Sequence, residues 1–156
     1  MKSIETLLRE HPFFAGMGDA DLATLAGCAQ NEQFEAGQTV FREGGEANRF
    51  YLIRHGRVAL LTHGGNRGWL TVETLHEGDV LGWSWLIPPY RWQFDARATS
   101  RTRVTAFDGS CLRRTCEADN RLGFDLVKRF AGELARRTAA ARLQLLDIYG
   151  GGRERA

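Results

Sequence analysis

The chain has 156 residues, of which 43% are hydrophobic and 26% charged, so it is long enough for one domain with a buried core. No apolar run approaches the ~20 residues of a membrane-spanning helix, and acidic Glu5 lies in an N-terminus without the apolar stretch of a signal peptide. These features argue against membrane insertion and secretion. The three cysteines are odd in number and lack paired spacing, which favours a reducing cytoplasm over a disulfide framework.

Charge is distributed unevenly along the chain. Residues 1–90 carry seven Lys and Arg against eleven Asp and Glu, whereas residues 91–156 carry fourteen against eight. A basic C-terminal part is typical of a solvated helix face, and it also suits a surface for nucleic acid or an acidic partner. We favour the solvated face.

The first thirty residues have the apolar spacing of two short helices. Leucines lie one turn after Ile4, the pair His11-Pro12 interrupts the pattern, and Asp19 is expected to cap the second helix. Cys28 follows near the apolar stripe of that helix, and we expect it to be a small buried side chain rather than a reactive thiol.

Residues 31–108 have the pattern of short strands separated by turns that contain glycine. Turn signals such as Gly44-Gly45 and His55-Gly56 separate the apolar runs. Because no helical segments separate the strands, the spacing favours a barrel or jelly roll over a parallel α/β fold. The predicted strands are Glu32–Glu35, Thr39–Arg42, Phe50–Arg54, Val58–Thr62, Trp69–Leu75, Asp79–Leu81, Asp95–Thr99 and Arg103–Phe107.

The helical period returns in residues 109–149. Ser110–Glu117 predicts a short helix, and Asp119 or Asn120 can cap a long helix that runs to about Ile148. At ~1.5 Å per residue that helix is ~42 Å long, more than this domain needs, so we expect part of it to contact a second copy of the chain. The predicted homodimer interface is the apolar stripe of Leu122, Leu126, Phe130, Leu134, Ala141 and Leu145. Three glycines at 150–152 are expected to end the helix, leaving residues 150–156 as a disordered tail.

Glycines at turn positions carry a resemblance to a known family. They flank the strand pair Phe50–Val58 and the run Gly78-Asp79-Val80-Leu81-Gly82, and they are Gly37, Gly44, Gly56, Gly78 and Gly82. From about His11 to Tyr149 this pattern resembles the cyclic-nucleotide-binding domain of the CRP/FNR regulators. The resemblance implies a mainly β fold, a jelly roll or double-stranded β-helix with flanking helices. It implies one domain over residues 1–149, with N-terminal helices (1–30), a β-roll (31–108) and C-terminal helices (109–149).

The sequence departs from this family in the phosphate-binding cassette, written roughly G-D-x-x-G-E-x-x-L. In the family, a short helix after the glycine turn presents amides to the cyclic phosphate, a Glu binds the ribose, and an Arg followed by Ser or Thr binds the phosphate. Here Trp83 stands at the Glu position, Trp92 at the Arg position and Gln93 at the Ser/Thr position. Losing the Arg forfeits a charge-assisted hydrogen bond of ~1.5–3 kcal/mol, so conventional cAMP binding is not expected.

Strand alternation places Arg91 and Trp92 on opposite faces. It groups Trp92 with Phe94 on one side, and Arg91 with Gln93 on the other. A one-residue bulge near the two prolines at 88 and 89 would instead turn Arg91 inward and restore a phosphate contact.

Five large aromatic residues crowd the segment from Trp83 to Phe94. They either fill the former pocket and extend the core, or line a pocket where indoles stack on a planar or apolar ligand. Such a ligand would be a cyclic nucleotide or another planar small molecule. The candidate ligand-binding residues are Gly82, Trp83, Ser84, Trp85, Arg91, Trp92 and Gln93.

No other pattern indicates catalysis or metal binding. His55, His63 and His76 fall at strand ends or turns without zinc-like spacing, and Cys111 and Cys116 lie about 140° apart around a helix. The sequence has no Ser/His/Asp arrangement, carboxylate pair in an apolar setting or P-loop, so an enzyme is not expected. The seven residues after the long helix are too few for a recognition helix, so we do not expect sequence-specific DNA binding by this chain alone.

The sequence therefore predicts a stand-alone regulatory module of the cytoplasm that senses a ligand and acts as a homodimer on an unknown protein partner. Two alternatives stay open. One is a genuine cAMP or cGMP receptor that uses Arg91 and the cassette amides, and the other is an adaptor that binds no small molecule.

Overall fold

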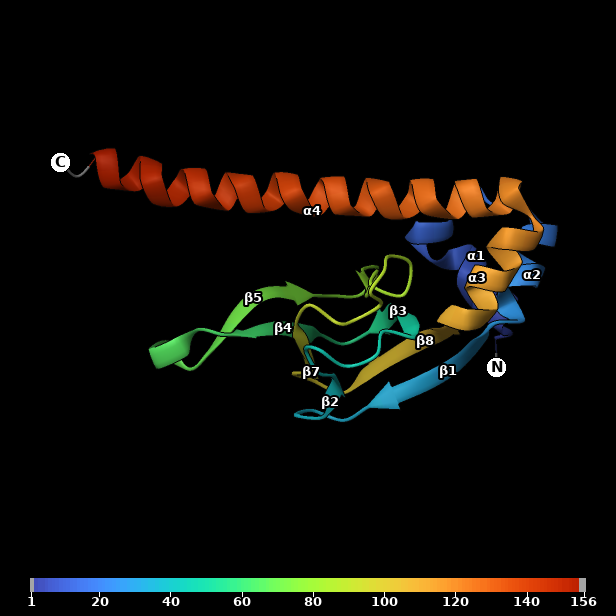
Figure 1. Cartoon of the computed structure of the whole chain (residues 1–156), viewed down its shortest axis with the longest axis horizontal. Coiled ribbons are helices and arrows are strands. Elements are labelled where there is room, and N and C mark those ends of the chain that lie inside the picture. Colours follow the sequence, from blue (N-terminus) through green and yellow to red (C-terminus); the bar gives the residue numbers. More distant parts are fainter. Residues whose placement is uncertain (1, 155–156) are drawn as a thin grey trace.

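Eight antiparallel strands form a roll of two four-stranded sheets, with strand orders β1-β8-β3-β6 and β2-β7-β4-β5 (Figure 1). The structure is a computed structural model that describes residues 2–154, with side chains as far as Ile148. The predicted jelly roll is confirmed, since every predicted strand overlaps an observed one. The strands are β1 Ala29–Phe34, β2 Thr39–Phe41, β3 Arg49–His55, β4 Val58–His63, β5 Trp69–Leu75, β6 Val80–Leu81, β7 Asp95–Ala98 and β8 Thr102–Asp108.

Strand β3 shows how the core is organised, because it is covered on both faces. Tyr51 and Ile53 point into the roll, where they pack against residues of the opposite sheet. Phe50 and Leu52 point outward and join a second apolar cluster beneath the helices. A strand that is buried on both faces reads as a continuous apolar run, and Phe50–Ile53 is such a run.

Short N-terminal helices cover the outer face of the first sheet (Figure 1). They are α1 Ile4–Glu10, the 3-10 turn η1 Pro12–Phe14 and α2 Asp19–Ala26. The predicted cap of α2 is wrong by one residue, because Gly18 is the N-cap and Asp19 begins the helix. Asp19 instead forms an ion pair with Arg9 of α1, with 3.0 Å between Arg9 Nη2 and Asp19 Oδ1.

Two C-terminal helices, α3 Gly109–Ala118 and α4 Asn120–Glu154, follow the last strand. Asp119 caps α4 as predicted, since its Oδ1 accepts a hydrogen bond from the Leu122 N–H at 3.1 Å. The end predicted at the three glycines is wrong, because α4 continues to Glu154. In Figure 1 α4 runs on past the N-terminal helices, and its side chains from 138 to 148 are all exposed.

The predicted dimer stripe is divided by the fold. Leu122, Leu126 and Phe130 are 1%, 1% and 3% exposed, because they pack on the chain's own helical cluster. They cannot contact a second copy in this conformation, so their assignment to a dimer interface is corrected. Of the other predicted residues, Ala141 and Leu145 are exposed, and Leu134 is half-buried.

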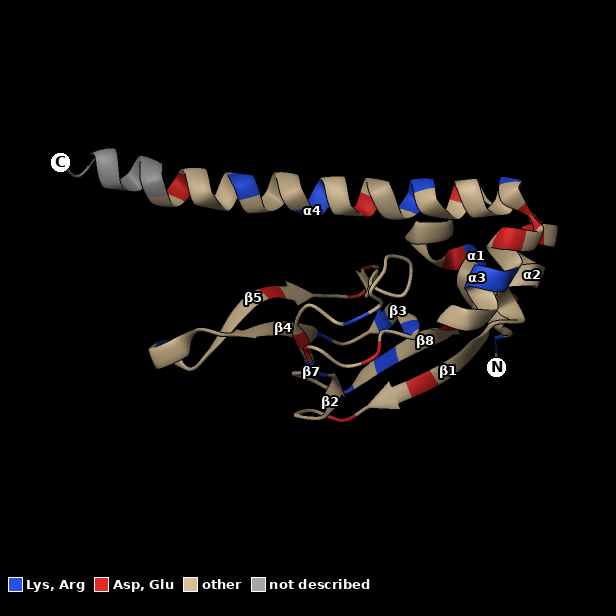
Figure 2. Ribbon diagram, viewed as in Figure 1, with Lys and Arg blue, Asp and Glu red and all other residues tan. Residues whose placement is uncertain are grey.

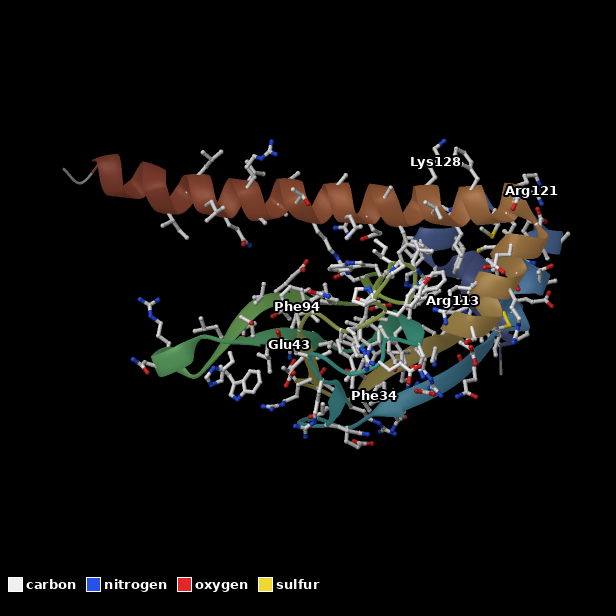
Figure 3. The ribbon with its side chains drawn as sticks, viewed as in Figure 1. Phe34, Glu43, Phe94, Arg113, Arg121 and Lys128 are labelled. Carbon is white, nitrogen blue, oxygen red and sulfur yellow. A yellow bond between two sulfur atoms is a disulfide. The ribbon has the colours of Figure 1, made fainter. Side chains whose placement is uncertain are left out.

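Cys28 and Cys111 form a disulfide, which contradicts the sequence prediction (yellow bond in Figure 3). The bond joins the residue before β1 to the first turn of α3, across 83 positions of sequence. The spacing of cysteines along the chain does not reveal such a pair, because the pairing of β1 with β8, in which the Asp108 N–H donates to the Cys28 carbonyl at 2.9 Å, brings them together. Cys116 is the free cysteine.

Candidate functional site

The cassette of residues 82–94 connects β6 to β7 and begins at Gly82, which has φ = +92°. Within the cassette, the Leu86 N–H donates to the Trp83 carbonyl at 3.0 Å and the Tyr90 N–H to the Ile87 carbonyl at 3.0 Å. These contacts make turns, and residues 82–94 contain no helix. The short helix that the family resemblance implied is therefore absent from this segment.

Trp92 fills the space behind the glycine turn. Its side chain is 6% exposed and stacks on Phe41 of β2, with ring centroids 3.7 Å apart and planes 7° from parallel. A Cβ atom at Gly82 would lie 2.7 Å from Trp92 Cζ3, so the indole is accommodated only because residue 82 has no side chain.

The cavity between Trp92 and the rest of the cassette has a volume of about 20 Å³, whereas a separate, open cavity of about 460 Å³ borders Trp92 among residues of β1, β2 and β3. The walls of the smaller cavity include Gly82, Trp83, Ser84, Trp92 and Gln93, five of the predicted site residues. Pockets for small molecules usually measure ~300–1,000 Å³, and a single water needs ~10–15 Å³. The structure thus brings the predicted residues together around a space for about one water.

Trp85 belongs to the core rather than to this cavity. It is fully buried, and its ring lies 5.7 Å from that of Phe50 and 5.6 Å from that of Phe130 on α4. The prediction that Trp85 lines the ligand pocket is corrected for this reason. Its neighbour Ser84 is also buried.

Arg91 points to solvent, so the bulge that would turn it inward is not present. Its backbone forms an antiparallel bridge with Glu46, and the next residue, Trp92, exchanges backbone hydrogen bonds of 3.0 and 2.9 Å with Gly45 and Gly44. This ladder fixes the alternation that leaves Arg91 and Gln93 exposed and Trp92 buried.

One residue of the following strand departs from that alternation. Strict alternation would place Asp95 on the exposed side with Arg91 and Gln93, yet it is 8% exposed. Its Oδ1 accepts a hydrogen bond from the Glu43 N–H at 2.8 Å, and this contact compensates its burial.

Two arginines of the C-terminal helices hold the cassette, and the sequence analysis missed both. Arg113 of α3, labelled in Figure 3, lies 4.7 Å from the ring centroid of Tyr90 and donates to the Trp85 carbonyl. Arg137 of α4 lies 5.7 Å from the centre of the Trp83 indole and donates to the Val80 carbonyl. Arg137 is seven residues, or about two helical turns, after the core residue Phe130, so the two lie on the same face of α4. This spacing is the feature of the sequence from which the inward position of Arg137 could have been predicted.

The basic residues of α4 are largely paired, and the solvated-face interpretation is wrong for two of them, because the Arg129 and Arg137 side chains are only 19% and 9% exposed. Figure 2 shows acidic residues interspersed with basic ones along this helix. Arg121 reaches Asp21 of α2 at 2.7 Å, and Arg129 reaches Asp125 at 3.1 Å. Ion pairs of this kind reduce the charge that a phosphate backbone would meet.

The described residues hold no cluster of three or more His, Cys, Asp or Glu side chains that suits a metal ion. Across the same part of the chain, no helix combines the length and apolar character needed to cross a membrane.

Comparison with known proteins decides the family. The model of the cyclic nucleotide-binding domain matches residues 31–119, more than half of the chain. The chain belongs to the cyclic nucleotide-binding domain family. A cyclic nucleotide-binding protein from Geobacter metallireducens has 32% sequence identity, with a TM-score of 0.79 over 88% of this chain and 99% of that one.

Two further relatives place the domain among regulatory proteins. The catabolite activator protein of Thermus thermophilus has 26% identity and a TM-score of 0.68 over 89% of this chain and 63% of that one. The regulatory subunit of the cAMP-dependent protein kinase of Eremothecium gossypii is 30% identical over 110 residues, or 70% of this chain. The chain spans only 23% of the length of that curated relative. These relatives are regulatory proteins, and the CRP-type resemblance is confirmed.

Proposed function

We propose that this domain is a regulatory protein-interaction module that works without a cyclic nucleotide. The observation that carries the proposal is the filled cassette, where the cavity of about 20 Å³ between Gly82 and Trp92 leaves no room for a nucleotide. This favours the adaptor alternative over the ligand sensor and over a receptor that uses Arg91.

Two costs oppose nucleotide binding. A nucleotide has to displace the Trp92 indole from its stack on Phe41, and exposing a buried large apolar side chain to water costs about 1.5–3 kcal/mol. The phosphate would then meet no guanidinium, because Arg91 faces solvent. Together these costs remove much of the ~8 kcal/mol that a micromolar complex requires.

Calorimetric titration with cAMP and cGMP, with tryptophan fluorescence read in parallel, tests the proposal. The natural protein is expected to give no binding heat and no emission change at millimolar nucleotide. The double variant Trp83→Glu/Trp92→Arg restores the two family side chains and is expected to gain binding. Micromolar binding by the natural protein would overturn the proposal.

The module is proposed to act as a homodimer through a mostly exposed face of α4. Apolar and small side chains recur there at alternating intervals of three and four residues, the spacing of a coiled-coil seam. Phe124, Leu145 and Ile148 are 71%, 54% and 70% exposed, which is unusual for such large side chains. The seam consists of Phe124, Val127, Ala131, Leu134, Thr138, Ala141, Leu145 and Ile148.

Light scattering coupled to gel filtration tests the seam. Leu145→Glu is expected to convert a dimer to a monomer, because a buried charge in the seam lacks a partner. The matched control is Leu143→Glu, since Leu143 is 64% exposed on α4 but lies outside the seam. A monomeric natural protein, or equal effects of both variants, would contradict the dimer.

The location of the module is also part of the proposal. We infer that it acts in the cytoplasm on a protein partner. The Cys28–Cys111 disulfide is the observation that weighs against a reducing compartment.

A further inference from the structure

A pair of arginines without acidic partners lies on the outer face of the first sheet, beside α1. Arg54 belongs to β3 and Arg103 to β8, and the ladder between these strands shifts register between Ile53 and His55. The Arg54 Nη2 reaches the Val104 carbonyl at a long 3.4 Å. Its Nε–H is buried and has no acceptor. Buried donors are nearly always paired, so this one points to a missing acceptor.

Among the side chains that the structure describes, no acidic group neutralises the positive charges of Arg54 and Arg103. Burial, and then the neighbouring positive charge of Arg103, lowers the pKa of Arg54 below the ordinary arginine value. No carboxylate among these side chains comes within 4.0 Å of either guanidinium. Two carboxylates nearby are already occupied, because Glu32 pairs with Arg49 and Glu10 with Lys2.

Arg54 stands where two cavities of about 460 Å³ each meet. Both are lined by Arg54 and by Leu7 of α1. The first cavity adds Arg103 and the amide side chains of Asn31 and Gln33, all of which can hydrogen-bond an anion or its polar substituents. Neither cavity shares a lining residue with the cassette, so this groove is separate from the filled nucleotide pocket.

We propose that this groove binds the carboxylate or phosphate group of a small molecule between Arg54 and Arg103. An oxyanion there would accept from the free Arg54 Nε–H and balance two adjacent positive charges. A volume of about 460 Å³ is in the range of small-molecule sites. Glu10, Glu32 and Glu77 line the two cavities and would repel an extended polyanion, which favours a small ligand over nucleic acid.

NMR titration tests the site, with inorganic phosphate and citrate as probes at constant ionic strength. The Arg54 Nε–H signal is expected to shift in a saturable way with at least one probe. A response to phosphate alone identifies a phosphate site, and a response to citrate alone a carboxylate site. Arg54→Gln and Arg103→Gln are each expected to weaken binding at least tenfold, the loss expected for a charge-assisted hydrogen bond.

Arg97→Gln is the matched control, because Arg97 is exposed on β7 in the other sheet and the variant removes the same charge. It is expected to leave binding unchanged. If Arg54→Gln does not fold, the exposed Arg103→Gln variant still decides the question. The absence of a saturable shift with both probes, or an equal loss in Arg97→Gln, overturns the proposal.

Discussion

The guanidinium of Arg137 on α4 lies over the indole of Trp83 in the cassette, with 5.7 Å from its carbon to the ring centroid. The same side chain forms an ion pair with Glu73 of β5 at 3.7 Å and is only 9% exposed. One arginine therefore ties the middle of α4 both to the cassette and to the edge strand of the second sheet. Because Trp83 belongs to the chain itself, this contact needs no ligand.

Arg137→Met is expected to loosen α4. The substitution keeps an apolar stem but removes the cation–π contact, worth ~0.5–2 kcal/mol, and the ion pair. Amide hydrogen exchange is expected to become faster in residues 131–148 and to stay unchanged in β3 and β8. Arg142→Met is the control, since Arg142 is exposed on the same helix. Equal exchange in the two variants would show that Arg137 does not position α4.

Trp92→Ala is expected to open the pocket. Removing a buried indole costs about 3–5 kcal/mol and leaves a cavity between Phe41 and Gly82. Urea unfolding is expected to show this loss, and added indole is expected to restore part of it by filling the cavity. Trp69→Ala provides the comparison, because Trp69 is 52% exposed and its removal is expected to cost much less. A Trp92→Ala protein as stable as the natural one would contradict the filled pocket.

Breaking the Cys28–Cys111 disulfide is expected to destabilise the domain. The bond closes a loop of 83 residues, and disulfides that constrain long loops contribute about 2–4 kcal/mol. Reductant should lower the urea midpoint of the natural protein and leave that of Cys28→Ser unchanged. Cys116→Ser, which alters the free thiol, should respond to reductant like the natural protein. A midpoint of the natural protein that does not change with reductant would show that the bond does not form in solution.

His11 is expected to make stability depend on pH. Burial lowers its pKa, opposed more weakly by the backbone carbonyl of Ile53, an acceptor that favours the protonated ring, and by acidic groups including Glu133 and Asp79. The unfolded chain then binds a proton more readily than the folded one. The contribution of neutral His11 to the stability of the fold is therefore fully present above the unfolded pKa of ~6.5. It is lost as the pH falls from there through the lower pKa of the folded state.

The variant His11→Asn checks this expectation. His11 Nδ1 accepts a hydrogen bond from the Phe13 N–H at 3.2 Å, and an Asn side-chain oxygen can replace it. Melting temperatures between about pH 7.5 and about pH 5.5 should fall less steeply in this variant. His76→Asn changes an exposed histidine and should keep the slope of the natural protein. An unchanged slope in His11→Asn would assign the pH dependence to other groups.

Much of the site could be predicted because its signals are local. The two-residue period of a strand places Trp92 inside and Arg91 outside, and the backbone ladder with Gly44 and Gly45 keeps that period. Whether the pocket is open or filled is not a local property. It depends on a ring of β2, Phe41, meeting the indole, and on the missing side chain at Gly82.

The sequence by itself determined the roll, its strands, the long C-terminal helix and the departures at Trp83 and Trp92, because periodicity and turn residues act over a few positions. Only the tertiary structure decided which face of α4 is covered, since Leu122 and Phe124 are both apolar and only packing against the helical cluster buries the first. It also decided the pairing of Cys28 with Cys111 and the placement of Arg137 over Trp83. These contacts join segments that are distant in sequence, and the free energy that selects them comes from packing the whole chain at once.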